Sequence, residues 1–104
     1  MQQIFKIDTI CQPRMLEVTR MNGQTGQMLC IGLVLTFAGQ ALFAEMFGEV
    51  AEEFAREQCA EGTLIQAEIE FKVRSWQNTA GTTSYGTNAK IRTYSIIKKE
   101  ERSF

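Results

Sequence analysis

The stretch "GEVAEEFAREQCAEG", residues 48–62, decides the fold because the spacing of the apolar residues changes there. Its apolar residues recur at the spacing of helical turns: Val50, Ala51, Phe54 and Ala55. Glutamates crowd the first turns, where the helix dipole favours anions, and Gly62 stands where the C-terminus of a helix favours glycine. We therefore expect one helix over residues 48–60, in a chain whose other segments have the patterns of strands.

Extended segments precede this helix. Residues 3–20 have an extended but irregular pattern, and Pro13 breaks it, which favours two short strands or one bent strand at a sheet edge. The Asn-Gly pair within residues 21–26 is a strong signal for a hairpin turn. We expect the next two strands over residues 27–37 and 41–47.

Two further strands follow the helix, over residues 63–77 and 89–98, and a polar, glycine-containing loop joins them. The order is therefore strand, strand, strand, helix, strand, strand. In a chain of 104 residues this order is typical of the five-stranded OB-fold barrel, an all-β fold with one helix between strands three and four. We expect a single OB-fold domain over residues 1–104, with its core at about 3–98 and a short charged tail at 99–104.

Charge is unevenly distributed along the chain, although the formal net charge is only -1. Residues 45–70 contain eight acidic residues and one basic residue, whereas residues 71–99 contain six basic residues and no acidic one. Such a division predicts one electropositive surface on a protein of balanced charge.

Aromatic residues share the predicted wet side of the last two strands with these cations. Alternation places three residues on one face of the strand before the loop: Lys72, Arg74 and Trp76. Its other face carries Ile69, Phe71 and Val73. In the last strand, Lys90, Arg92 and Tyr94 fall on one face. A wet face that presents cations together with an indole and a phenol suits a ligand with negative charge and flat surfaces.

Several function classes are disfavoured by composition. The three cysteines are far apart, so we expect neither a disulfide framework nor a zinc site, and the chain has no histidine. Glu68 and Glu70 alternate on one strand, but a single pair of carboxylates is weak support for acid–base catalysis. We therefore expect no enzymatic activity, no metal and no small-molecule cofactor.

One apolar run, residues 28–47, has about the length of a membrane span. Polar residues and glycine interrupt it at Thr36, Gly39, Gln40 and Glu45, so two strands joined by a short loop explain it better. The start of the chain shows no secretory leader. We expect a cytoplasmic protein without membrane contact.

The sequence resembles the bacterial single-stranded DNA-binding protein family in two segments. "FGEVAEEFA", residues 47–55, is similar to the segment that opens the helix of that family. "EGTLIQAEIEFKVRSWQNTAGTTSYGTNAKI", residues 61–91, is similar to a strand that ends in alternating basic residues and a tryptophan, followed by a loop with glycine, tyrosine and threonine. The resemblance extends over roughly residues 13–97.

This resemblance implies an OB-fold homo-oligomer, a dimer or a tetramer, that binds single-stranded DNA with little sequence preference in replication, recombination or repair. It implies aromatic contacts to nucleotides from Phe47 and Trp76. The family usually has a tryptophan early in the third strand, where this chain has Ala41 or Leu42 with Phe43 nearby. The acidic tail by which the family recruits other enzymes is absent from the sequence, so we do not expect partners by that route.

Nine residues form the expected binding site: Phe43, Phe47, Lys72, Arg74, Trp76, Tyr85, Lys90, Arg92 and Tyr94. Bases stack on aromatic side chains and phosphates follow cations in such sites. Other roles stay open here, because Phe43 and Phe47 could belong to the core and Tyr94 could be a cross-strand partner. Two alternatives also stay open for the whole chain: a protein-interaction module with an OB fold, and an RNA-binding OB domain.

Overall fold

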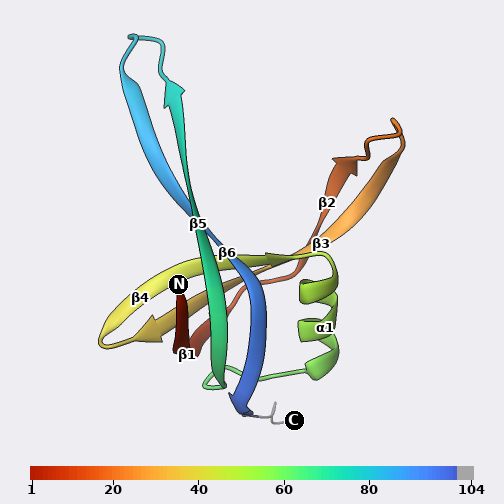
Figure 1. Cartoon of the computed structure of the whole chain (residues 1–104), viewed down its shortest axis with the longest axis vertical. Coiled ribbons are helices and arrows are strands. Elements are labelled where there is room, and N and C mark those ends of the chain that lie inside the picture. The colour runs from red at the N-terminus through yellow and green to blue at the C-terminus, as the bar shows by residue number, and fades with distance from the viewer. Residues whose placement is uncertain (101–104) are drawn as a thin grey trace.

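The computed structural model describes residues 1–100, which form six strands and one helix (Figure 1). In chain order they are β1 (Gln2–Ile10), β2 (Arg14–Thr19), β3 (Thr25–Phe37), β4 (Gln40–Phe47), α1 (Glu49–Glu57), β5 (Leu64–Gln77) and β6 (Thr83–Lys98). The apolar run at residues 28–47 forms most of β3 and all of β4, as expected. No helix within residues 1–100 is long and apolar enough to cross a membrane.

Five of the strands close into a barrel. The sheet order is β1-β5-β6-β4-β3-β2, and β1 also pairs with β3, so β1, β5, β6, β4 and β3 form a ring. All pairings are antiparallel except that of β4 with β6, which meet in parallel at Glu45 and Lys90. A ring of five strands with one helix confirms the expected OB-fold barrel.

The strand count differs from the expected five because the first extended segment is split. Between β1 and β2 the chain leaves strand geometry at residues 11–13, where Pro13 has no N–H to donate to a ladder. β2 then pairs with β3 alone and lies outside the ring. The helix therefore follows the fourth strand, and the prediction that it lies between strands three and four is wrong by one strand.

Two element boundaries also differ from the prediction. The helix ends at Glu57, and Gln58 takes the left-handed conformation that was expected of Gly62. The loop expected before residue 89 is largely strand, because β6 begins at Thr83. Its short turn is held by Asn78, whose Oδ1 accepts hydrogen bonds from the backbone N–H groups of Ala80 and Thr82 at 3.0 Å each.

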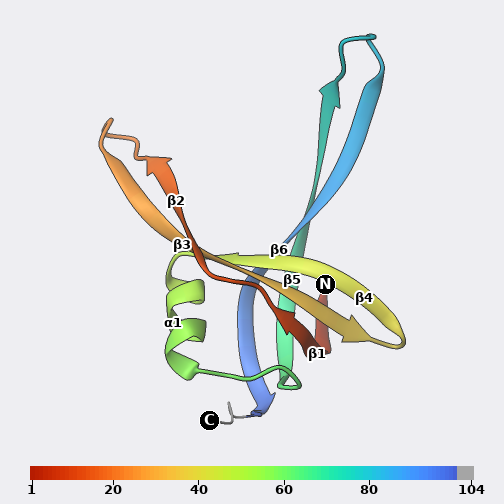
Figure 2. The same ribbon diagram turned by 180° about the vertical axis from the view of Figure 1, so that it is seen from behind.

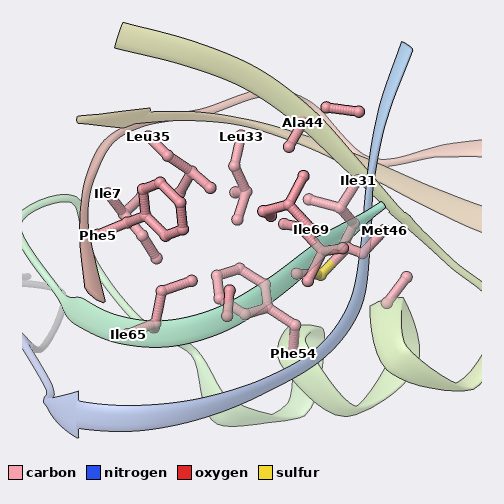
Figure 3. Packing of buried hydrophobic residues seen from close by; sticks show 14 of the residues in the cluster. Phe5, Ile7, Ile31, Leu33, Leu35, Ala44, Met46, Phe54, Ile65 and Ile69 are labelled. Carbon is pink, nitrogen blue, oxygen red and sulfur yellow. The ribbon is translucent and has the colours of Figure 1, made fainter. Parts of the chain in front are cut away.

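The core fills the barrel with side chains from every strand of the ring (Figure 3). Among its fully buried members are Phe5, Ile7, Ile31, Leu33, Leu35, Met46, Ile65, Ile69 and Ile91. From α1, Ala51 and Phe54 add to the same cluster. Phe5 meets Phe37 edge to face, with ring centroids 5.3 Å apart. On β3 the alternation of strand side chains buries Ile31, Leu33 and Leu35 on one side.

Two hairpins extend from the barrel as arms (Figures 1 and 2). One is formed by β2 and the start of β3, and the other by the end of β5 and the start of β6. We call residues 71–89 the β5–β6 arm. Side chains at 71–80 are all exposed, so apart from Ala89 at its base the arm lies outside the core, and both of its faces are open to a ligand.

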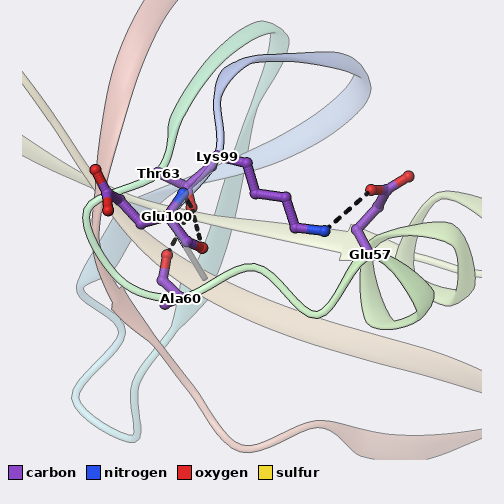
Figure 4. Close-up of polar contacts among 5 residues, drawn as sticks. All are labelled: Glu57, Ala60, Thr63, Lys99 and Glu100. Carbon is purple, nitrogen blue, oxygen red and sulfur yellow. Dashed lines mark hydrogen bonds and ion pairs between the residues drawn. The ribbon is translucent and has the colours of Figure 1, made fainter. Parts of the chain in front are cut away.

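The start of the expected charged tail folds back onto the barrel (Figure 4). The carbonyl of Glu100 accepts a hydrogen bond from the Ala60 N–H at 2.8 Å, and its own N–H donates to Thr63 Oγ1 at 3.0 Å. Lys99 pairs with Glu57 at 3.9 Å. The remainder of the tail, residues 101–104, lies outside the described residues.

A bulge at Arg92 changes which side chains of β6 face the core. Beyond it, the side chains that simple alternation would place outside point inward. Thr93 pairs with Glu68 but Ile91 pairs with Ile69, so Arg92 is an extra residue without a partner. Beyond it Tyr94 packs against the core, with its ring 5.7 Å from Phe54 in an edge-to-face contact. The prediction that Tyr94 shares a wet face with Lys90 and Arg92 is therefore wrong.

Removing the hydroxyl of Tyr94 should leave the fold intact at neutral pH. This hydroxyl is buried without a hydrogen-bond partner among the described residues, so Tyr94→Phe should keep or slightly raise the free energy of unfolding at pH 7. Burial, followed by the charges of Glu53 and Glu57, raises the pKa of Tyr94 from 10.0 to about 12.

A folded-state pKa above the unfolded one means that the neutral phenol stabilises the fold below pH 10, and that this contribution disappears as the pH rises through 12. Tyr94→Phe should therefore lessen the loss of stability between pH 10 and pH 12, measured by urea unfolding at several pH values. Tyr85→Phe, at an exposed tyrosine, is the matched control. Equal changes from the two substitutions would contradict the assignment.

Candidate nucleic-acid interface

A continuous sheet surface runs from β4 across β6 to β5 on the side away from the core. Strand pairing places Lys90 beside both Glu45 and Glu70. Alternation then puts one set of side chains on this side, which we call the outer face: Phe43, Glu45, Phe47, Glu70, Lys72, Arg74, Trp76 and Lys90. The structure thus brings six of the nine expected site residues onto one face.

Trp76 stands near the tip of the β5–β6 arm and is 47% exposed. Its ring lies against Gly86 of β6, so close that a Cβ added at Gly86 would be 3.2 Å from the ring. The guanidinium of Arg74 lies 5.4 Å from the ring centroid, within the range of a cation–π contact. Trp76 therefore presents an aromatic surface with a cation beside it.

Phe43 has an equivalent position on β4. It is 53% exposed, so the core role considered for it is excluded. Its ring lies over Gly32 of β3, where an added Cβ would be 2.9 Å from two ring carbons. Phe47 lies four pairs further along the same strand and is half-buried, opposite Cys30.

Three of the expected cations lie on the outer face without an acidic partner. Lys72, Arg74 and Lys90 are exposed, and none of them forms a salt bridge within residues 1–100. Arg92, at the bulge, instead pairs with Glu70 at 3.5 Å. Exposed pairs of this kind contribute little stability, so Arg92 can exchange Glu70 for another anion at small cost.

Arg14 is a cation that the sequence did not indicate for this surface. It reaches from β2 to Glu45 on β4, with 2.8 Å between Nη2 and Oε2, and this hydrogen bond raises the pKa of Arg14. The Cys30 thiol donates to the same Oε2 at 3.3 Å, and burial first, then Glu45, raise the pKa of Cys30. The Asn-Gly signal at residues 21–26 predicted a hairpin turn. A hairpin at this place pairs β2 with β3 and so brings Arg14 opposite Cys30.

Tyr85 is not on the outer face. It pairs with Ser75, and alternation places it on the opposite side of the β5–β6 arm with Phe71 and Val73. Tyr85 is 70% exposed there. With Tyr94 turned to the core, the structure separates both tyrosines from Trp76.

The closed barrel and its helix define an OB fold. The chain is similar to crystal structures of the mitochondrial single-stranded DNA-binding protein Rim1 from S. cerevisiae. One of them has a TM-score of 0.64 and 11% sequence identity, and the match covers 98% of this chain and 96% of that one. A second has a TM-score of 0.57 and 16% identity, with coverage of 96% and 95%.

No protein-family description matches the sequence, and no curated protein matches it. At these identities the structural likeness establishes the fold alone. The function must therefore be argued from the outer face itself.

Proposed function

We propose that this chain binds single-stranded DNA with little sequence preference through its outer face. The observation that carries the proposal is that two exposed rings, Trp76 and Phe43, share one surface with unpaired cations. A single strand offers unpaired bases that stack on such rings and phosphates that follow such cations. Stacking and phosphate contacts read no base edges, so little sequence preference follows.

The fold likeness supports this proposal, because Rim1 is by name a single-stranded DNA-binding protein. We also propose that the chain is a divergent relative of the bacterial family of that name, with a role in replication, recombination or repair. The segments around Phe47 and Trp76 that resemble the family support this relationship. We propose binding without catalysis, since Glu70, one of the two carboxylates that alternate on β5, is engaged by Arg92.

A protein-interaction module is the second candidate, and one feature favours it. The side of the β5–β6 arm opposite the outer face exposes Phe71, Val73 and Tyr85 and carries no charged residue. Exposed apolar and aromatic side chains without charge are typical of protein contacts rather than of phosphate binding. The two sides of the arm therefore allow a direct test between the candidates.

Substitutions on opposite sides of the arm separate these candidates. Trp76→Ala should weaken binding to a labelled oligothymidine by about 1–3 kcal/mol, because it removes a stacking surface. Tyr85→Ala, which removes a ring of greater exposure from the other side, is the matched control and should change the affinity little. Fluorescence anisotropy at fixed salt measures both affinities. Loss of affinity in Tyr85→Ala but not in Trp76→Ala would contradict the proposal.

The dependence of affinity on salt tests the cations. Each phosphate neutralised on a single strand contributes about 0.7 to the slope of log affinity against log salt. The double substitution Lys72→Gln and Lys90→Gln should lower affinity and flatten that slope.

The control is Lys6→Gln with Lys98→Gln, which changes the net charge equally at a pocket lined by Gly62 and Leu64, outside the outer face. If both doubles flatten the slope equally, the cations act through net charge and not as a phosphate track. Competition between oligothymidine and oligouridine of equal length tests the preference for DNA over RNA.

We further propose that the chain is a homo-oligomer, a dimer or a tetramer. The sequence suggested the first strand as the open edge, but β1 pairs on both sides and the strand with one partner is β2. Exposed apolar residues near these strands include Ile4 and Met15. An open strand edge with apolar neighbours favours association.

Light scattering at micromolar concentration should therefore give a multiple of 11.8 kDa. A single mass of 11.8 kDa across that concentration range would exclude the oligomer.

A further inference from the structure

Both exposed rings of the outer face rest on a glycine that lies diagonally across from them on the neighbouring strand. Trp76 pairs with Ser84 and its ring lies over Gly86, two residues along β6. Phe43 pairs with Val34 and its ring lies over a glycine two residues away on β3, Gly32. Diagonal cross-strand neighbours on one face are within reach of aromatic side chains.

Backbone conformation does not require glycine at either position. Gly32 and Gly86 lie within strands and neither has a positive φ, unlike the turn glycines Gly39 and Gly81. Glycine in a strand interior weakens the strand because it adds backbone entropy to the unfolded chain and packs no side chain. The neighbouring ring is what excludes a side chain, since an added Cβ would lie 3.2 Å from Trp76 or 2.9 Å from Phe43.

We propose that Gly86 and Gly32 are positioning residues for ligand stacking. Because each lacks a side chain, the neighbouring aromatic ring can lie against the sheet in a fixed position and orientation. This inference rests on the proposed function. An exposed ring that is free to rotate loses side-chain entropy when a base stacks on it. A ring already seated on the sheet loses less, so the glycines raise affinity without touching the ligand.

The first test uses ligand-free protein and the single tryptophan. A methyl group at Gly86 should lift the ring of Trp76 away from the arm, so Gly86→Ala should shift the emission to the red and increase quenching by acrylamide. Gly26→Ala is the matched control, because its Cβ would meet only the flexible end of Arg20, at 3.1 Å. Gly86 lies in the arm, outside the core cluster, so we expect the variant to fold.

Affinity for oligothymidine then connects the ring position to binding. Gly86→Ala should lower the affinity about fivefold to tenfold, a part of the stacking contribution of one base. Gly32→Ala tests the second ring independently and should also lower it severalfold. Melting temperatures should stay level or rise in both variants, since alanine reduces the entropy of the unfolded chain.

Double substitutions show whether each glycine acts through its ring. Gly86→Ala should cause no further loss of affinity when Trp76 is already alanine, and Gly32→Ala none when Phe43 is alanine. A loss that persists in those backgrounds would overturn the positioning role, as would unchanged emission of Gly86→Ala. Wild-type affinity in Gly86→Ala and Gly32→Ala would overturn it while leaving the proposed function intact. Failure of the wild type to bind oligothymidine would overturn both.

Discussion

The barrel depends on β1, which is hydrogen-bonded along both of its edges. Its first half pairs with β5 and its second half with β3, and Lys6 belongs to both ladders. This double pairing closes the ring, because without the β1–β3 ladder the strands would form an open sheet with β1 at one edge and β2 at the other. Closure is also what turns Phe5 and Ile7 inward, where they pack in the core.

Closure fixes the directions in which the two arms leave the barrel. β3 and β5 are longer than the barrel requires, and the excess of each strand pairs with a neighbour to form a two-stranded arm. An arm of this kind has two open faces, and alternation gives them different chemistry. In the β5–β6 arm the cations and Trp76 take one face and Phe71, Val73 and Tyr85 the other. The barrel thus supports a two-stranded arm that has two exposed faces of different chemistry.

Features that depend on residues close together in the sequence could be predicted from it. The helical period around Phe54 predicted the helix that adds Phe54 to the core, and the barrel class followed from the order of the elements. The position of Trp76 on the cationic face could also be predicted, because no irregularity interrupts β5 beyond Glu70. Partners distant in sequence could not be predicted, such as Arg14 with Glu45. Gly32 was visible as an isolated glycine in a predicted strand, a pattern that signals a close approach, but the approaching ring was not visible. Gly86 fell in the predicted loop, so its place in a strand could not be predicted.

The bulge at Arg92 marks a place where β6 can lose one residue without turning its core residues outward. Strand side chains alternate with a period of two, and the extra residue changes odd positions facing the core, Ala89 and Ile91, into even ones, Tyr94 and Ile96. Loss of Arg92 would leave Thr93 opposite Glu68 and Tyr94 facing the core, because Ile91 and Thr93 already pair with adjacent residues of β5. A length change in the turn at residues 78–82 also leaves the core side chains in place, because residues 71–88 of the arm are exposed or half-buried and none belongs to the core cluster. Among sequences of this fold, a change of one residue in length is therefore tolerable both at the tip of the arm and at this bulge.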